Sequence, residues 1–524
     1  MTITHVSGRR LFGRVGPAAF VVTALLASAT TALAMALIAT APVRVPDNPL
    51  AASSTTCAQL VAQSTALGSK NFPDAEVEPF VAVDPTNASH LVATFQQDRW
   101  NDGGSNGLTN VVSTDGGAHW SLAAKQPQFS ICAGATAGSP GFFQRATDPW
   151  VSFSANGKIV YSISDSFNAN GPGFGGASAI LISRSIDGGF TWQTPVTAEL
   201  DTSFTVLNDK ESVTGDPVKA NSAYAVWDRL VSPNTKANPD AFTFTRAFRG
   251  PSLFSKTTDG GQTWSQGRVI FDPGQENQTI GNQIVVPTAG PAAGTLIDGF
   301  DLIVNFQRAI SPNVFNVALI RSADGGATWS GATIVSGLVD APVTIAGKAV
   351  RTGDILPAWG TGPTGTLYTA WQDGRFTGKA AIAFSQSNDG GLTWSKPIRV
   401  DQTRGSAPAF TPQLAVASDG TVGVAYYNLE NATPTAPGLT DEFIVHCHAA
   451  TSDCSAAASW SAGGETRLST TGSFDMTTAP NAGGFFVGDY EGLATSGTVF
   501  DPFFVMAKPI ATRGPTDPFA STAR

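Results

Sequence analysis

The chain is poor in charged residues. Of its 524 residues only 14% are Asp, Glu, Lys or Arg, and the formal net charge is −9. It contains no basic stripe and no segment that interleaves arginines with aromatic residues, so nucleic acid is excluded as an expected partner. With 55 Gly, 33 Pro and 11 Trp, the composition is instead typical of an extracytoplasmic all-β protein, and the length suffices for one large core.

The N-terminus has a composition of its own. Arg9, Arg10 and Arg14 precede an apolar stretch over residues 17–41, and residues 32–34 form an Ala-x-Ala cleavage pattern. This order is typical of an export signal, and its start is similar to a twin-arginine signal. The apolar stretch is also long enough for a retained membrane anchor. We therefore predict that residues 1–41 are an export signal or membrane anchor, and that the rest is secreted or held at the cell surface.

Five near-copies of one eight-residue turn organise the rest of the chain. Each places Asp-Gly-Gly after a short apolar run and a Trp five residues beyond the Asp. The Asp can accept loop N–H bonds, the glycines tolerate positive φ, and the Trp can pack over apolar neighbours, so each copy predicts a structural hairpin turn. This structural role is assigned to Asp115, Asp187, Asp259, Asp324, Asp389, Trp120, Trp192, Trp264, Trp329 and Trp394.

The five turns resemble the Asp-box, or bacterial neuraminidase repeat, with the pattern Ser/Thr-x-Asp-x-Gly-x-Thr-Trp. All five copies match it, with His119 in place of Thr in the first, and a worn sixth copy is expected at Asp453 and Trp460. Successive aspartates of the five copies are 65 or 72 residues apart, which suits a four-stranded antiparallel blade. The predicted fold is all-β, a β-propeller of four-stranded antiparallel blades.

A second repeat bears on the number of blades. Seven segments begin with a polar residue and then turn apolar, and a second apolar strand follows each, so seven blades are favoured over the six of many related sialidases. The seven starting residues are Glu78, Asp148, Glu211, Gln283, Asp354, Gln413 and Asp489. The seventh unit ends after two strands. We therefore predict that residues 42–77, and within them the segment near 57–77, close the ring, that the propeller spans residues 78–511, and that residues 512–524 form a tail.

The four cysteines are expected to form two disulfides, because an exported chain meets an oxidising compartment. Cys447 and Cys454 flank the hairpin expected in the sixth unit, which favours their pairing and leaves Cys57 for Cys132. Zinc binding by His446 and His448 is the weaker alternative, because no second ligand cluster exists. No metal ligands are assigned.

The topology predicts which face carries chemistry. In a propeller the turns between third and fourth strands open on the face opposite to the starts of the first strands, so the five turns lie away from the candidate site. Second strands end on the same face as first strands begin. The ends of the second strands carry Asp98, Arg99, Asp165, Asp228, Arg229, Arg308, Asp373, Arg375, Asn428 and Glu430. These groups either brace neighbouring blades or surround a pocket for a polar ligand such as a glycan.

The resemblance to Asp-box sialidases implies specific roles. Those enzymes hold a substrate carboxylate with three arginines, use an Asp as acid/base and use a Tyr activated by Glu as nucleophile. Carried over, this makes Asp98, Asp148 or Glu78 the acid/base, and Tyr427 or Tyr490 with Glu430 or Glu491 the nucleophile pair. The predicted substrate-binding residues are Arg99, Arg229, Arg308, Arg375, Glu211, Asp228, Asp354, Asp373 and Asp489. The family's Arg-Ile-Pro signature is absent, and Glu78-Pro79 stands roughly in its place.

Three functions stay open at this point. The first is a sialidase-like, exo-acting glycoside hydrolase on acidic glycans, and the second is a non-catalytic propeller that binds glycans or proteins. The third is an acidic channel that holds calcium, as a structural ion or for lyase chemistry. No cofactor other than such a calcium ion is expected, and the protein is expected to be monomeric.

Overall fold

The computed structural model describes residues 36–235, 249–304, 311 and 313–524, all of which belong to one compact unit that begins at Ala34. The export signal or anchor predicted for residues 1–41 lies outside the described residues as far as residue 35. Within the described part of the chain, no helix is long and apolar enough to cross a membrane.

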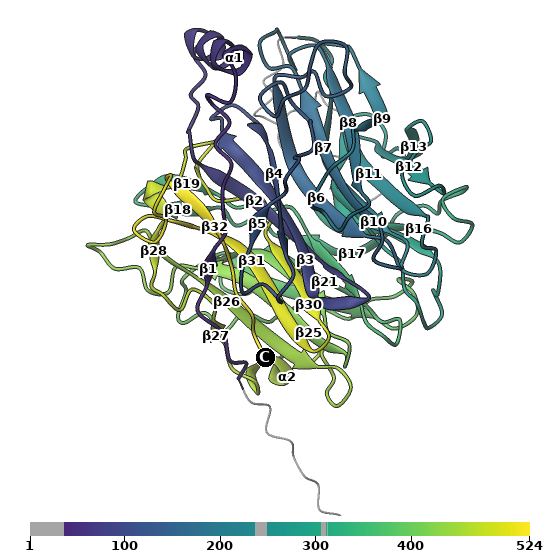
Figure 1. The fold of residues 1–524 in the computed structure, drawn as a ribbon. Helices are drawn as coiled ribbons and strands as arrows, with labels where there is room; N and C mark the ends of the chain where they lie inside the picture. Colours follow the sequence, from purple (N-terminus) through teal and green to yellow (C-terminus); the bar gives the residue numbers. More distant parts are fainter. Residues whose placement is uncertain (1–35, 236–248, 305–310, 312) are drawn as a thin grey trace, which may run out of the picture. The chain divides into compact units, whose positions relative to one another are not determined.

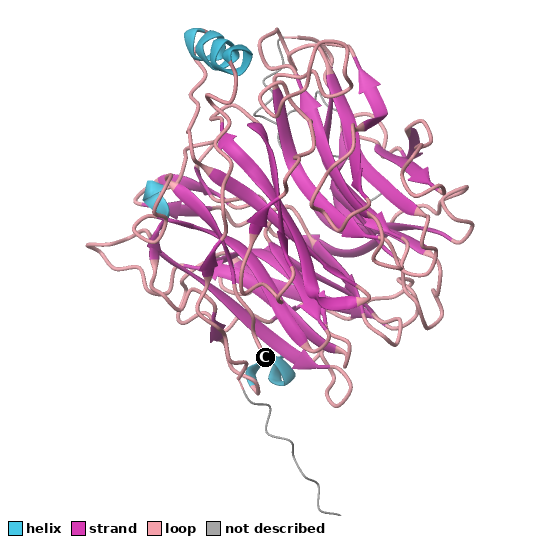
Figure 2. Cartoon of the chain, viewed as in Figure 1, coloured by secondary structure: helices cyan, strands magenta, loops and turns pink. Residues whose placement is uncertain are grey.

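The described chain is all-β apart from short helices, as Figure 2 shows in magenta and cyan. The helices are α1 (Thr55–Ala66), α2 (Ala457–Ser461) and the 3-10 turn η2 (Met476–Thr478). Most strands form four-stranded antiparallel sheets in which consecutive strands pair, as predicted.

The first two sheets are joined by one residue pair, Ser105 with Ala146. The first contains β2 (Glu76–Asp84), β3 (Asn87–Arg99), β4 (Ser105–Ser113) and β5 (Ser121–Leu122), and the second contains β6 (Arg145–Phe153), β7 (Val160–Phe167), β8 (Ser178–Ser185) and β9 (Val196–Asp201). The third contains β10 (Val206–Gly215), β11 (Ala223–Val231), β12 (Ser252–Thr257) and β13 (Arg268–Phe271), and the fourth contains β14 (Asn277–Val285), β15 (Leu296–Val304), β16 (Phe315–Ser322) and β17 (Thr333–Leu338).

The remaining sheets follow the same order. The fifth contains β20 (Ala358–Thr361), β21 (Leu367–Asp373), β22 (Ala381–Ser387) and β23 (Ile398–Arg399), and the sixth contains β24 (Ala409–Val416), β25 (Thr421–Asn428), β26 (Leu439–His448) and β27 (Thr466–Arg467), with β28 (Phe474–Asp475) beside β26. The last contains β30 (Gly492–Ser496), β31 (Val499–Ala507), β32 (Thr516–Ala520) and β1 (Val43–Arg44). A small extra sheet consists of β18 (Val343–Ile345), β19 (Lys348–Arg351) and β29 (Phe485–Phe486).

The apolar cores lie between neighbouring sheets. Tyr161 of the second sheet shares one core with Trp227 of the third, and Phe384 of the fifth shares another with Tyr426 of the sixth. This explains why second strands read as nearly continuous apolar runs, since both of their faces are covered. The first strands contact one another in the order β2, β6, β10, β14, β20, β24, β30, and β30 contacts β2 again. This cyclic arrangement agrees with the predicted propeller.

The last sheet is completed from both ends of the chain. β32 supplies its third strand and β1 its fourth, with Val43 opposite Ala520, so the purple N-terminal segment runs beside yellow C-terminal strands in Figure 1. Residues 42–77 were predicted to close the ring, and β1 lies within them, but the closing strand is residues 43–44 and not the segment near 57–77. Residues 512–524, predicted to be a tail, contain β32. Residues 55–66 instead form α1, and the two-residue length of β1 left no periodic pattern to detect.

The five Asp-Gly-Gly turns join third and fourth strands, as predicted. In the third sheet, Asp259 accepts hydrogen bonds from the Thr257 hydroxyl (2.8 Å), the Thr263 amide (3.0 Å) and the Thr263 hydroxyl (2.6 Å). The worn sixth copy, between β26 and β27, is replaced by α2 with the buried Trp460. Both predicted disulfides, Cys57–Cys132 and Cys447–Cys454, are present.

Candidate functional site

A repeated β-bulge directs side chains toward the middle of the ring of first strands. Pairing with the second strand shifts register at the same place in β2, β6, β10, β14 and β24. The residue at each bulge has positive φ: Glu78 (52°), Asp148 (49°), Lys210 (49°), Gly281 (73°) and Thr411 (52°). A non-glycine residue in this region costs on the order of 1–3 kcal/mol and persists only where the surroundings enforce it.

Three of these bulges come together on one buried ammonium group. Lys210 Nζ lies 3.1 Å from Glu78 Oε1, 2.8 Å from Asp148 Oδ1 and 2.8 Å from Asp489 Oδ2. Arg351 at the end of β19 binds Asp489 through two nitrogens, one of them 2.8 Å from Oδ1. Lys210 and its three carboxyl partners are each at least nine-tenths buried. We call Glu78, Asp148, Lys210, Arg351 and Asp489 the central ion cluster.

The carboxyl groups of the central ion cluster differ strongly in pKa. Burial would raise the pKa of Asp489, but Arg351 and Lys210 outweigh it and hold that pKa well below its usual value. Burial raises the pKa of Glu78 to about 8 against the pull of Lys210. Burial also raises the pKa of Asp148. Because its carboxylate partners outweigh burial, Lys210 stays charged, with a raised pKa. At neutral pH the site therefore holds a neutral Glu78 beside an ionised Asp489.

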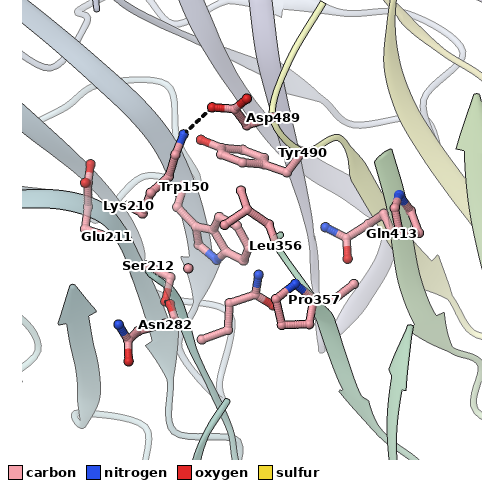
Figure 3. Close-up of a pocket in the computed structure, with 14 residues that line it drawn as sticks. Trp150, Lys210, Glu211, Ser212, Asn282, Leu356, Pro357, Gln413, Asp489 and Tyr490 are labelled. Atoms are coloured by element: carbon pink, nitrogen blue, oxygen red, sulfur yellow. Dashed lines mark hydrogen bonds and ion pairs between the residues drawn. The ribbon is translucent and has the colours of Figure 1, made fainter. Parts of the chain in front are cut away.

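Next to the cluster lies a recess that opens to solvent and has a cavity volume of about 20 Å³, room for about one water molecule (Figure 3). Trp150, which stacks on Phe80 with ring centroids 3.5 Å apart, and Tyr490 provide aromatic walls. Lys210, Glu211 and Asp489 contribute charged or ionisable groups. The other lining residues are Ser212, Gly281, Asn282, Gln283, Leu356, Pro357, Ala358, Pro412 and Gln413. Aromatic faces next to amides and carboxyls are the surfaces that bind the apolar faces and hydroxyl groups of a sugar.

Glu211 is the unusual acid of this recess. One of its oxygens accepts a hydrogen bond from the Asp165 amide, and Oε2 has no hydrogen-bond partner among the described residues. Burial, followed by the charges of Asp148 and Asp165, raises its pKa well above the usual value. Burial therefore favours the protonated form of Glu211, a residue that borders the recess and is only 3% exposed.

The structure brings together only some of the predicted site residues. Three predicted residues belong to the central ion cluster: Glu78, Asp148 and Asp489. Arg99 donates a hydrogen bond to Gln96 (2.8 Å) and lies over the Phe486 ring. Glu211, Gln283 and Gln413 line the recess. Asp165 is buried behind Glu211, with its pKa also raised well above the usual value by burial.

Other predicted residues hold the fold together instead. Asp98 accepts amide bonds from Leu50 (2.8 Å), Ala51 (2.7 Å) and Asp74 (2.8 Å), and so anchors the N-terminal segment. Asp228 accepts from the Gly281 amide (2.9 Å) and fixes the bulge of β14.

Two of the arginines predicted to form a clamp, Arg229 and Arg375, are paired elsewhere. Arg229 pairs with Glu199 and with Asp201 (2.9 Å), and Arg375 pairs with Asp373 (2.7 Å) at its own strand end. Arg308 lies outside the described residues. Among the acids predicted for the same pocket, Asp354 has a pKa of about 7, raised by burial and by Asp340. Arg229 and Arg375 therefore do not join the predicted common pocket, because Arg375 is neutralised by an acid at its own strand end and Arg229 by two acids of β9 in the neighbouring sheet.

Neither predicted tyrosine–glutamate pair presents a free nucleophile. The Tyr427 hydroxyl is buried between β25 and β31, where it donates to the Val505 carbonyl (2.9 Å). Glu491 is buried beside Tyr427 and Glu442, and burial raises its pKa to about 8. Tyr490 lines the recess but donates to the Pro149 carbonyl (3.0 Å).

Two further predicted groups end up at the surface or on a strand end. Glu430 pairs with the exposed Arg404 (3.0 Å), and Asn428 is buried at the end of β25.

Lys210, Arg351 and Trp150 were missed from sequence. Asp148-Pro149-Trp150 repeats the Glu78-Pro79-Phe80 pattern, and this similarity was the available signal for the bulge. Lys210 gave no such signal, because no proline follows it.

The calcium alternative for the channel finds little support in the geometry. Among the described residues, the one group of three acids close enough to share an ion is Asp47, Glu76 and Asp517, at the ring closure. In the central ion cluster, Lys210 already occupies the position between the carboxylates.

Comparison with known proteins gives neither a matching family model nor a matching curated relative. Solved structures with a similar arrangement include a Hadza microbial sialidase, with 14% identity over 72% of this chain and 66% of that chain and a TM-score of 0.45. The NanB sialidase from Streptococcus pneumoniae has 11% identity over 82% of this chain and 83% of its own, with a TM-score of 0.44. The alpha-L-arabinofuranosidase Arb93A from Fusarium graminearum has 12% identity over 74% and 92%, with a TM-score of 0.44. The chain spans slightly less than two thirds of the Hadza sialidase.

Proposed function

We propose that the chain is an extracytoplasmic glycoside hydrolase built on a seven-bladed β-propeller, with its active site in the central recess. Seven four-stranded units and the cyclic contacts of their first strands support the blade number. The two disulfides indicate an extracytoplasmic location, since such bonds persist in oxidising compartments. The export signal predicted at the N-terminus supports secretion or surface display.

The observation that carries the proposal is the pair of unlike carboxyls that line one recess. Burial favours the protonated form of Glu211, while Lys210 and Arg351 favour the ionised form of Asp489. Two carboxyl groups whose environments push their pKa values apart are the requirement for cleaving a glycosidic bond, because one must give a proton while the other stays negative.

In the proposed reaction Glu211 donates its proton to the leaving glycosidic oxygen as the bond from that oxygen to the anomeric carbon breaks. The ionised Asp489 stabilises the positive charge that develops on the sugar ring. Water then adds its hydroxyl group to the anomeric carbon and returns a proton to Glu211. Trp150 and Tyr490 hold the sugar ring, and Asn282, Gln283 and Gln413 offer hydrogen bonds to its hydroxyls.

The substrate proposed for this site is a neutral sugar. Lys210 is the cation that lines the recess, and three carboxyl groups already surround it, among them the ionised Asp489. The described strand-end arginines Arg229 and Arg375 are bound to acids of their own. An acidic sugar would have to displace one of these partners, so the acidic glycans expected from the sequence are the less favoured class.

The test is a hydrolysis screen of the purified protein against aryl glycosides of neutral and acidic sugars. We expect turnover of a neutral glycoside, and a loss of at least about 100-fold in kcat for Glu211→Gln with KM changed little. The matched control is Glu465→Gln, which replaces a carboxyl of raised pKa (about 7) outside the recess and should leave turnover unchanged. Equal loss in both variants would contradict the assignment of Glu211.

A second candidate is a non-catalytic glycan-binding propeller. It is favoured by one observation: Asp489, the ionised partner, is bound by both Lys210 and Arg351 and is therefore a weak base. Under this alternative the recess binds a sugar with measurable affinity and releases it uncleaved.

A further inference from the structure

Three buried carboxyl groups meet at the seam where the ring of sheets closes. Asp47 follows β1, Glu76 begins β2, and Asp517 lies in β32, so each comes from a different segment. One oxygen of each lies within 4.8 Å of one oxygen of each of the others. All three residues are buried, with Glu76 and Asp517 at 0% exposure.

The positive charge nearby does not balance these carboxyls. Arg44 contacts Asp47 (2.9 Å) and Asp517 (2.7 Å), while Arg513 is 3.7 Å from Asp47 and its side chain is 61% exposed. Glu76 has no cationic partner among the described residues. Its Oε1 accepts a hydrogen bond from the Gln97 amide, and its Oε2 has no hydrogen-bond partner there although the residue is fully buried.

We propose that Asp47, Glu76 and Asp517 bind one calcium ion, which fastens the two ends of the chain to the first strand. Calcium takes oxygen ligands at 2.3–2.6 Å, so two of its ligands lie at most about 5.2 Å apart, and the three oxygens meet this limit. Asp47 Oδ2 and Asp517 Oδ1 each accept one hydrogen bond from Arg44 and keep a second lone pair for the ion. Glu76 Oε2 supplies the ligand that no protein group uses, and water or backbone carbonyls complete the coordination.

The position of this site indicates a role in closing the ring of sheets. β1 has only two residues, and its pairing with β32 is the contact that closes the last sheet. The backbone hydrogen bonds of so short a strand break easily. An ion bound by all three segments stabilises the closed arrangement, because the segments cannot separate without losing the ion. This calcium site joins the closing sheet to β2, and none of its three acids lines the recess.

The test measures calcium binding and melting temperature of the full chain after removal of metal with EDTA. We expect one calcium ion per chain, with Kd on the order of 10⁻⁴–10⁻³ M as in extracellular modules. At calcium tenfold or more above Kd, Tm should rise by roughly 1–3 °C.

Two variants make the test specific. Glu76→Gln keeps the shape of the side chain and removes the carboxyl oxygen that no protein group uses, so it should melt at or above the wild-type temperature in EDTA and lose the response to calcium. Asp47→Asn should weaken calcium binding at least tenfold. The matched control Glu442→Gln replaces another fully buried Glu, away from the seam, and should keep the full response. Absence of saturable binding in the wild type, or an unchanged response in Glu76→Gln and Asp47→Asn, would overturn the proposal.

Discussion

Lys210 occupies the bulge position at which the two preceding sheets carry Glu78 and Asp148. The sequence pattern favours Glu211 as the equivalent of those acids, but Glu211 is one residue away from the true equivalent, Lys210. A shift of one residue in a strand turns the side chain to the opposite face, so the cation of the cluster was missed and Glu211 was given the wrong neighbours. The bulge depends on how β10 pairs with β11, and no local pattern in the sequence specifies that pairing.

At this scale we predict that Lys210→Met lowers the free energy of unfolding by roughly 3–5 kcal/mol, because it leaves buried carboxylates without a cation. Adding Asp148→Asn should recover part of the loss, since it removes one of the uncompensated charges. Denaturant unfolding of the single and double variants measures both effects. A double variant no more stable than the single one would show that the cluster does not depend on this charge balance.

In the exposed turns, the ionised form of an Asp stabilises the fold, and this gives a prediction about pH. Burial opposes ionisation of Asp259, but the hydrogen bonds from Thr263 and Thr257 together outweigh it and lower its pKa to about 2. A depressed pKa contributes stability that is present above pH 4 and is lost as pH falls toward 2. Asp259→Ala should cost about 1–2 kcal/mol at pH 7 and less at pH 2. Melting curves at both pH values check this, and turnover per folded molecule should not change.

At the scale of elements, the strands and turns were predictable because each is specified by its own residues. The apolar second strands and the Asp-Gly-Gly turns needed no knowledge of distant contacts. The closing strands were not predictable, because β1 and β32 are short and gain their stability from pairing with each other. This pairing joins residues that are far apart in the sequence, so no local pattern of residues predicts it.

Deletion of residues up to 46 removes β1 and Arg44, and so exposes the edge of β32. We expect this protein to aggregate and to melt at a lower temperature, because an unpaired edge strand is open to other chains. The control deletion of residues 1–35 leaves β1 in place. Light scattering and melting of the two proteins separate these outcomes. Equal solubility and stability would show that β1 does not close the sheet.

At the scale of the whole molecule, buried carboxyls determine how stability depends on pH. Burial raises the pKa of Glu78 and of Glu491 to about 8. A raised folded-state pKa gives stability that is complete below the ordinary value near 4.5 and is lost as pH rises through 8. Asp489, whose pKa is lowered, acts in the opposite sense and loses its contribution in acid.

We therefore predict that the protein is most stable near pH 5 and that Tm falls between pH 5 and pH 8. Glu491→Gln, which cannot ionise, should flatten this fall, because it removes one of the groups responsible. Calorimetry across this pH range measures both. A Tm that rises toward pH 8 in the wild type would contradict the assignment of neutral buried carboxyls.

The central claim is that the recess between the first strands cleaves a glycosidic bond with Glu211 as proton donor. The most direct measurement compares release of the aryl group from a neutral aryl glycoside by the wild type and by Glu211→Gln, together with sugar binding by both. Our account predicts that both proteins bind the sugar and that only the wild type releases the aryl group at an appreciable rate. Sugar binding without release by the wild type, or equal release by both proteins, would contradict it.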